Sequence, residues 1–268
     1  MLKLVATDLD GTLLHSDGTV TERTRRVLRA VEEMGVTVVF VTGRPIRWMD
    51  DFWEHVGGHG LAICSNGGIV YDVNARAVSR SRTIPVEVGL EVARTLRATI
   101  PGTTFAIETT DGFAREPGFM PRIPPPEGLK VGALSEILDD SAVKLLARHE
   151  DKEPELFWAE AESHVGDLVT TTWSSTGALV EMSAAGVTKA STLELLCAER
   201  GVAAEEVVAF GDMPNDLPML QWAGTAYAMA NGHTSVRELA RHLAPSHDDD
   251  GVAIVLEQLF GLRPGFGG

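Results

Sequence analysis

Hydrophobic residues in the first quarter of the chain occur in short, nearly continuous runs separated by stretches with helical spacing. Residues 2–6, 36–41 and 61–64 are such runs, the pattern of parallel strands buried on both faces. Apolar positions between the first two runs recur at helical spacing up to Gly35, a residue type that commonly ends a helix. Strands that alternate with helices in this way predict an α/β fold with a doubly wound parallel sheet.

The same pattern returns near the end of the chain. Leu193, Leu196 and Cys197 follow helical spacing, and we expect this helix to end at Gly201. Two further apolar runs, residues 207–210 and 227–230, predict strands. Both ends of the chain therefore contribute to one catalytic core, assigned to residues 1–84 and 185–268.

The middle of the chain has a different texture, which predicts an inserted α+β cap domain at residues 85–184. Its expected elements are helices from Pro85 onward and over 155–165, a short strand at 144–147, a proline-rich extended loop at 117–126, and two hairpins that pair 103–107 with 112–115 and 168–173 with 179–183. Hairpins beside helices are typical of a module that is separate from a parallel sheet.

Composition and charge narrow the class of partner. The chain has 268 residues and a formal net charge of −15, which argues against nucleic acid because phosphate backbones select basic surfaces. No apolar stretch approaches the roughly 20 residues that span a bilayer, so no membrane partner is expected. The first strand begins without a visible signal peptide, and two cysteines, Cys64 and Cys197, indicate a reducing compartment, so a cytoplasmic location is predicted. A monomer and a homodimer are both open.

Polar residues cluster where the predicted parallel strands end and, for Lys189, at the start of a late predicted helix. Ligands of an open parallel sheet bind beyond the carboxyl ends of its strands, so we expect these clusters to lie together. Asp8 and Asp10 place two carboxylates two residues apart, which indicates a metal site, a paired acid and nucleophile, or both. The clusters are Asp8 with Asp10, Thr42 with Gly43, Lys189, and Asp212 with Asn215 and Asp216.

The chemistry of these clusters is consistent with one site. Carboxylates without histidine or cysteine suit a hard divalent cation, and Mg²⁺ is the expected cofactor. The Thr42 hydroxyl, the Gly43 N–H and the Lys189 ammonium group suit the oxygens of a phosphoryl group. Because Mg²⁺ commonly binds one or two carboxylates together with a substrate phosphate, both ligand sets fit the same place.

Four motifs resemble, in kind and in order, those of the haloacid dehalogenase superfamily. They are DLDGT at 8–12, VTGR at 41–44, Lys189, and GDMPND at 211–216. The gap of about 145 residues between VTGR and Lys189 can hold the large C2-type cap that members carry there. The strings SNGG and GDMPNDLPML look like the Cof-type, sugar-phosphatase-like branch, and the resemblance covers nearly the whole chain.

This resemblance implies a Mg²⁺-dependent phosphatase that hydrolyses small phosphorylated metabolites, with sugar phosphates as the expected class, through an aspartyl-phosphate intermediate. Asp8 would be the nucleophile, and Asp10 would act as acid and then as base. The cation would be held by the Asp8 carboxylate, the Asp10 main-chain carbonyl and Asp212, with Asp216 in support. The groups that would hold the phosphoryl oxygens are the Leu9 N–H, Thr42, Gly43, Lys189 and Asn215.

Alternatives remain at this stage. A phosphomutase or a specialised sugar phosphatase could use the same scaffold, and a catalytically silent protein that binds phosphorylated metabolites belongs to a different functional class. Asn66 could support Asp8 or the substrate, but a role in the turn at residues 65–68 is expected. Residues 248–250 would form a solvated turn. Three basic residues of the insert could contact a distal substrate group, but a place on its solvated surface is expected for each: Arg115, Arg122 and Lys144.

Overall fold

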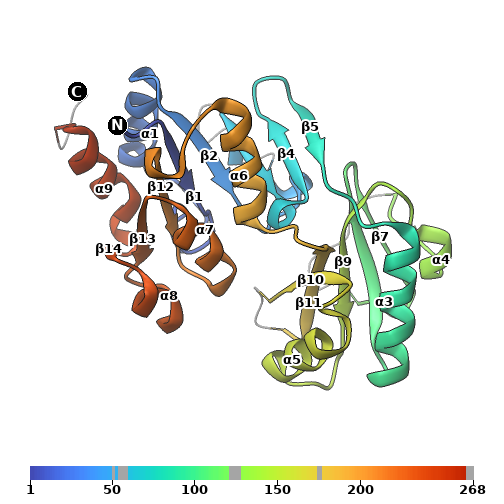
Figure 1. Ribbon diagram of the computed structural model, residues 1–268. Helices are drawn as coiled ribbons and strands as arrows, with labels where there is room; N and C mark the ends of the chain where they lie inside the picture. The colour runs from blue at the N-terminus through green and yellow to red at the C-terminus, as the bar shows by residue number, and fades with distance from the viewer. Residues whose placement is uncertain (50–51, 54–59, 121–127, 174–176, 264–268) are drawn as a thin grey trace.

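The computed structural model describes residues 1–49, 52–53, 60–120, 128–173 and 177–263. Its strands form two sheets that lie side by side (Figure 1). Both ends of the chain build a sheet of eight strands, and the middle of the chain builds a sheet of six. The predicted α/β class with a parallel core sheet is confirmed.

In the larger sheet the strands are arranged β14-β13-β12-β1-β2-β3-β4-β5. The strands from β14 to β3 run parallel, whereas β4 and β5 add an antiparallel hairpin at one edge. The sequence pattern did not predict this hairpin because all five residues of β5 are exposed and so carry no apolar signal. The bounds are β1 Leu4–Thr7, β2 Thr37–Val41, β3 Leu61–Cys64, β4 Ile69–Asp72, β5 Ala77–Ser81, β12 Val207–Gly211, β13 Thr225–Met229 and β14 His242–Ala244.

Helices cover both faces of this sheet. Helices α1 (Glu22–Glu33) and α9 (Gly251–Phe260) pack on the face to which Val5 points. Helices α6 (Lys189–Arg200) and α7 (Leu217–Trp222) pack on the face to which Leu4 points. Successive residues of β1 thus enter different apolar cores, which explains why its sequence lacks the alternation of a half-exposed strand.

The smaller sheet has the order β10-β11-β9-β6-β7-β8, and helices α3 (Val86–Thr99) and α5 (Pro154–Val165) pack on one of its faces. Both predicted hairpins are present, as the antiparallel pairs β6–β7 and β10–β11. Residues 121–127, most of the predicted extended loop, lie outside the described residues. The bounds are β6 Thr104–Thr109, β7 Phe113–Arg115, β8 Lys130–Val131, α4 Leu134–Ile137, β9 Ala142–Arg148, β10 Val169–Thr172 and β11 Leu179–Ala184.

Shorter elements complete the chain. Helix α8 spans Thr234–Leu239, and single 3-10 turns span Ile46–Trp48, Ser65–Gly67, Ala204–Glu206, Pro214–Asp216 and His247–Asp249. Asp250, expected in a solvated turn, instead has a side chain only 17% exposed. It accepts hydrogen bonds from Thr21 and Thr24 and contacts His15, which joins the starts of α1 and α9. None of the described helices is both long and apolar enough to cross a membrane.

Candidate active site

Asp8 and Asp212 directly follow two neighbouring strands at the centre of the larger sheet. Strand β1 ends at Thr7 and pairs in parallel with β12, which ends at Gly211. From β1 the chain crosses to β2 on one side, whereas β12 leads to β13 on the other side (Figure 1). A crevice between strands whose connections leave in opposite directions is where open α/β sheets bind ligands.

Three buried carboxylates and one buried ammonium group form the centre of this crevice. Carboxylate oxygens of Asp8, Asp212 and Asp216 lie within 4.8 Å of one another. Lys189 Nζ donates to Asp8 at 2.6 Å and to Asp216 at 2.7 Å. Three carboxylates against one ammonium group form a compact oxygen-rich cluster with excess negative charge when ionised. Such a donor set fits a hard divalent cation such as Mg²⁺.

Lys189 reaches the cluster because it is the first residue of α6. The Thr188 hydroxyl accepts a hydrogen bond from the Ser191 N–H, and the Ser191 hydroxyl accepts one from the Thr188 N–H, each at 3.0 Å. This reciprocal cap fixes where the helix begins. It therefore fixes the residue that faces the ends of β1 and β12.

The loop after β12 is closed by hydrogen bonds to the side chain of Asp216. Asp216 Oδ2 accepts the N–H groups of Asp212 and Met213, both at 3.0 Å, while its Oδ1 faces Lys189. Asp212 is held from the turn after β1, because the Thr12 hydroxyl donates to its Oδ1 at 3.0 Å. Asp216 thus shapes the loop as well as adding negative charge.

Gly11 is required between these two loops. Its φ is +76°, in the region that favours glycine, and a Cβ at this position would clash with Asp212 Oδ2. The DLDGT turn can approach Asp212 this closely only because residue 11 has no side chain.

Burial controls the ionisation of the cluster. It raises the pKa of Asp8 well above 3.8, against the attraction of Lys189 and with further upward shifts from Asp216 and Asp212. Burial and the charge of Asp216 also raise the pKa of Asp212 to about 6. For Lys189, burial lowers the pKa, but Asp216 and Asp8 together outweigh it and the pKa is raised. A cation bound among the carboxylates would favour their ionised forms.

Asp10 is separated from this cluster. Its side chain is 57% exposed and accepts from Arg44 Nε at 2.8 Å, with a second contact from Arg44 Nη2. The DLD pair therefore sends one carboxylate into the crevice and the other to its rim. Leu9 between them has a buried side chain, so only its main chain can face a ligand.

The remaining predicted ligands gather around Asn66. The Asn66 N–H donates to the Thr42 carbonyl oxygen at 3.0 Å, and Asn215 Nδ2 donates to Asn66 Oδ1 at 3.3 Å. Gly43 is adjacent, since a Cβ there would lie 3.0 Å from Asn66 Oδ1. Asn66 does occupy a turn, with φ of +56°, but its side chain also links the loops after β2 and β12.

One expectation about the insert was wrong. Lys144, expected on a solvated surface, is 2% exposed and contacts the larger sheet. The sequence carried no signal that this face of β9 is covered, because the covering loops are remote in the chain. Arg115 instead binds main-chain carbonyls of its own loop, and Arg122 lies outside the described residues.

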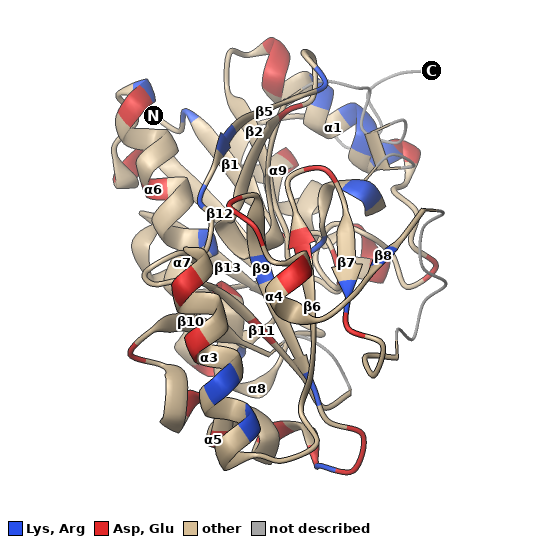
Figure 2. Cartoon of the chain, turned by 90° about the vertical axis from the view of Figure 1, so that its right-hand side faces the viewer, with Lys and Arg blue, Asp and Glu red and all other residues tan. Residues whose placement is uncertain are grey.

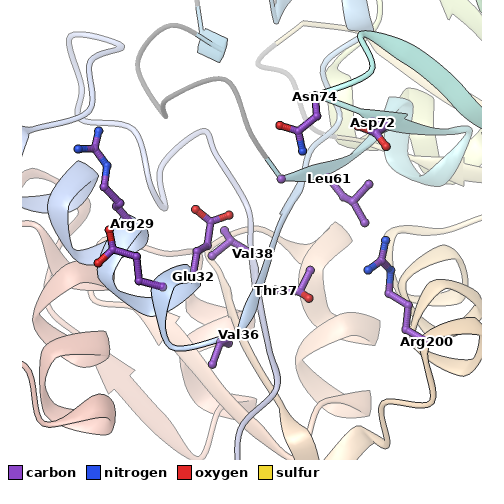
Figure 3. A pocket seen from close by; sticks show the side chains of 12 residues that line it. Arg29, Glu32, Val36, Thr37, Val38, Leu61, Asp72, Asn74 and Arg200 are labelled. Atoms are coloured by element: carbon purple, nitrogen blue, oxygen red, sulfur yellow. The ribbon is translucent and has the colours of Figure 1, made fainter.

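A separate hollow of about 630 Å³ opens at the other ends of the parallel strands (Figure 3). Thr37 and Leu61, the first residues of β2 and β3, line it together with Arg29 of α1 and Arg200 of α6. It therefore lies away from Asp8 and does not contribute to the carboxylate cluster.

The chain matches one family model and several proteins that are named as phosphatases. The family model described as haloacid dehalogenase-like hydrolase matches residues 5–256. The chain is 28% identical over 274 residues to 5-amino-6-(5-phospho-D-ribitylamino)uracil phosphatase YitU of Bacillus subtilis (strain 168), across 97% of this chain and 98% of that protein. It is 29% identical over 264 residues to pyridoxal phosphate phosphatase YbhA of Escherichia coli (strain K12), across 94% of this chain and 96% of that protein.

Solved structures agree with the fold. SMU.1108c from Streptococcus mutans UA159 matches with a TM-score of 0.83 at 21% identity, over 97% of this chain and 100% of that one. TM0651 from Thermotoga maritima matches with a TM-score of 0.78 at 25% identity, over 96% of this chain and 97% of that one. With the family model matching almost the entire length, the chain belongs to the haloacid dehalogenase-like hydrolase family.

Proposed function

We propose that this protein is a Mg²⁺-dependent phosphatase that hydrolyses small phosphorylated metabolites through an aspartyl-phosphate intermediate. The observation that carries the proposal is the buried cluster of Asp8, Asp212 and Asp216 around Lys189, at the crevice between β1 and β12. The phosphatase activity itself is supported by the activities for which the relatives are named. The cation and the intermediate rest on the chemistry of the cluster.

In this mechanism one Asp8 carboxylate oxygen attacks phosphorus, and the bond from phosphorus to the leaving oxygen breaks. Lys189 holds Oδ1 of Asp8, which leaves Oδ2 for the attack. Asp10, at the rim, gives a proton to the leaving oxygen and later takes one from the water that cleaves the aspartyl-phosphate. The first step releases the alcohol, and the second step regenerates Asp8 and releases free phosphate.

Asp8, Asp212 and the Asp10 main-chain carbonyl would hold Mg²⁺, with Asp216 in support; when bound, the cation offsets the negative charge shared by nucleophile and phosphate. Thr42, Gly43, Asn215, Lys189 and the Leu9 N–H hold the phosphoryl oxygens. The gathering of the first three around Asn66 supports this assignment.

Residues 85–184 act as a cap in this proposal. The face of their sheet opposite α3 and α5 is turned toward the loops that follow β2, as the contacts of Lys144 with Gly43 and of Glu108 with Arg47 indicate. Sugar phosphates are one proposed substrate class. The relatives' named substrates, a phosphoribitylaminouracil and pyridoxal phosphate, add phosphorylated ring compounds as another.

The surroundings favour a compact anionic substrate bound through local positive groups. Acidic residues are spread over helices that pack on both sheets (Figure 2), in keeping with the net charge of −15. Lys189 and Arg44 are cationic groups at the carboxylate cluster and its rim. Both cysteines are buried and free, which supports the proposed cytoplasmic location; a monomer or a homodimer accommodates the same site.

The test is phosphate release from a panel of sugar phosphates, phosphorylated ring compounds and p-nitrophenyl phosphate, with MgCl₂ or with EDTA. We expect release only with the cation and none from Asp8→Asn. Transfer of phosphate between positions of a sugar, without release, would instead identify a phosphomutase. Binding of a phosphorylated compound without either reaction would identify a silent binding protein.

A further inference from the structure

Lys144 is a buried cation that joins the two sheets. It belongs to β9 of the smaller sheet, and its side chain is 2% exposed. Its Nζ donates to Glu181 of neighbouring β11 at 2.9 Å and to the main-chain carbonyl oxygen of Gly43, after β2 of the larger sheet, also at 2.9 Å. A buried ammonium group is costly unless such partners satisfy it, so these contacts hold the sheets in a defined relation.

The contact falls on one of two peptide planes that flank Gly43. The plane between Thr42 and Gly43 is held by Asn66, whose N–H donates to the Thr42 carbonyl at 3.0 Å. The plane between Gly43 and Arg44 is held by Lys144 at its carbonyl and by the Thr42 hydroxyl at its N–H, the latter at 3.0 Å. C=O and N–H of a trans peptide point in opposite directions, so holding the Thr42 carbonyl also directs the Gly43 N–H.

Gly43 needs this external support because glycine has the greatest backbone freedom of any residue. Asn66 holds the plane that carries the Gly43 N–H, and the plane that carries the Gly43 carbonyl is held by Thr42 and, from the smaller sheet, by Lys144. Lys144 therefore fixes the Gly43 carbonyl directly, whereas the Gly43 N–H, a proposed phosphate donor, is directed by Asn66.

A second branch of the same contact leads to Asn215. Glu181 Oε2, which accepts from Lys144, also accepts from Asn66 Nδ2 at 2.7 Å. Asn66 Oδ1 in turn accepts from Asn215 Nδ2 at 3.3 Å. The pair of Lys144 and Glu181 thus supports two proposed phosphate ligands, Gly43 by one branch and Asn215 by the other.

We propose that Lys144 is a positioning residue. It holds the Gly43 carbonyl directly and, through Glu181 and Asn66, orients the Gly43 N–H and the Asn215 side chain for binding the phosphoryl group. This inference rests on the proposed function and deepens it. The phosphate site then takes part of its support from the smaller sheet. Through these contacts Lys144 affects the binding of the phosphoryl group, which all substrates share, and not the binding of the leaving group.

A matched contact in the same interface provides a control. Arg47, which follows Gly43 by four residues, pairs with Glu108 of β6, and Glu108 lies opposite Lys144 in the register of the smaller sheet. Glu108 is also buried, with a side chain 5% exposed. Glu108→Gln therefore removes the charge from a neighbouring contact of the same interface while the contacts of Lys144 with Gly43 and Glu181 remain.

The experiment measures binding of inorganic phosphate by titration calorimetry with MgCl₂ present, together with kcat/KM for p-nitrophenyl phosphate and for one larger substrate. For Lys144→Met we expect phosphate affinity to fall roughly 10- to 100-fold, the scale found when a supporting hydrogen-bond partner is removed. We expect a similar loss in kcat/KM for both substrates, and partial recovery in Lys144→Arg. Glu108→Gln and the exposed Lys130→Met should keep the phosphate affinity of the wild type.

Unchanged phosphate affinity in folded Lys144→Met overturns the inference, as does a loss confined to the larger substrate. If Lys144→Met does not fold, Lys144→Met with Glu181→Gln removes the stranded charge and is judged by the same two measurements. A wild type that binds phosphate but hydrolyses no ester overturns the proposed phosphatase, while the titration still decides the role of Lys144. Normal wild-type turnover with no effect of Lys144→Met overturns the positioning role alone.

Discussion

The Nζ atom of Lys189 lies 2.6 Å from Oδ1 of Asp8, although the two residues are 181 positions apart in the chain. The contact joins the end of β1 to the start of α6 and is buried on both sides, with side chains 2% and 6% exposed. It holds the proposed nucleophile in one orientation. It also supplies part of the positive charge that an incoming phosphoryl group requires.

Asp8→Asn should abolish phosphate release while leaving the fold intact. An amide cannot form the aspartyl-phosphate, yet it occupies the same volume and relieves the unfavourable burial that raises the pKa of Asp8. Phosphate release and thermal unfolding measure the two effects, and we expect the unfolding temperature without metal to be unchanged or higher. Turnover close to wild type would remove Asp8 from the role of nucleophile.

Lys189→Met should destabilise the metal-free protein as well as inactivate it. The substitution leaves Asp8 and Asp216 facing each other without their shared cation, and breaking a buried pair in this way costs on the order of 3–5 kcal/mol. The free energy of unfolding is measured in urea with EDTA.

The double variant Lys189→Met with Asp216→Asn separates the two effects. It removes one of the stranded charges, so it should recover part of the stability but none of the activity. Full stability in the single variant would contradict the charge balance inferred for this cluster.

Binding of Mg²⁺ should be visible without any substrate. A ligand that binds only the native state raises the unfolding temperature, by an amount set by its concentration relative to its dissociation constant. We expect MgCl₂ to raise the unfolding temperature of the wild type and to have little effect on Asp212→Asn, which loses one carboxylate of the cluster. An equal shift in both proteins would indicate that the cation binds elsewhere.

Asp250 should make a pH-dependent contribution to stability. Burial opposes its ionisation, but hydrogen bonds from Thr21, His15 and Thr24 outweigh burial and hold its pKa below 3.8. A carboxyl group whose pKa is lower in the native state than in the unfolded state contributes its full stabilisation at pH values above the unfolded-state pKa. That stabilisation is lost as the pH falls through the native-state pKa.

The free energy of unfolding is compared between wild type and Asp250→Asn. Asparagine is a suitable replacement because it tolerates the φ of +58° found at this position. Urea unfolding between pH 7 and pH 3 should show wild type more stable at neutral pH, with the difference shrinking below about pH 4. A difference that stays constant across this range would show that the carboxylate charge is not what stabilises the junction of α1 and α9.

The larger sheet was predictable because its central strands are buried on both faces. Burial of this kind demands continuous apolar runs, and β1, β2 and β12 have them. Edge strands are less buried, so their sequences need fewer apolar residues. Strand β5 is exposed throughout and β14 at two of its three residues, so neither left a recognisable pattern.

The motifs alone indicated which groups could do the chemistry, because carboxylates and a hydroxyl that follow parallel strands meet at one edge of the sheet, and Lys189 begins a helix beside them. The folded structure set which of these groups share the buried cluster and which lie outside it. It sent Asp8 into the buried cluster and Asp10 to the rim with Arg44, and it buried Lys144 against Gly43. These outcomes depend on contacts between residues far apart in the chain, and such contacts leave no local periodicity for a sequence pattern to reveal.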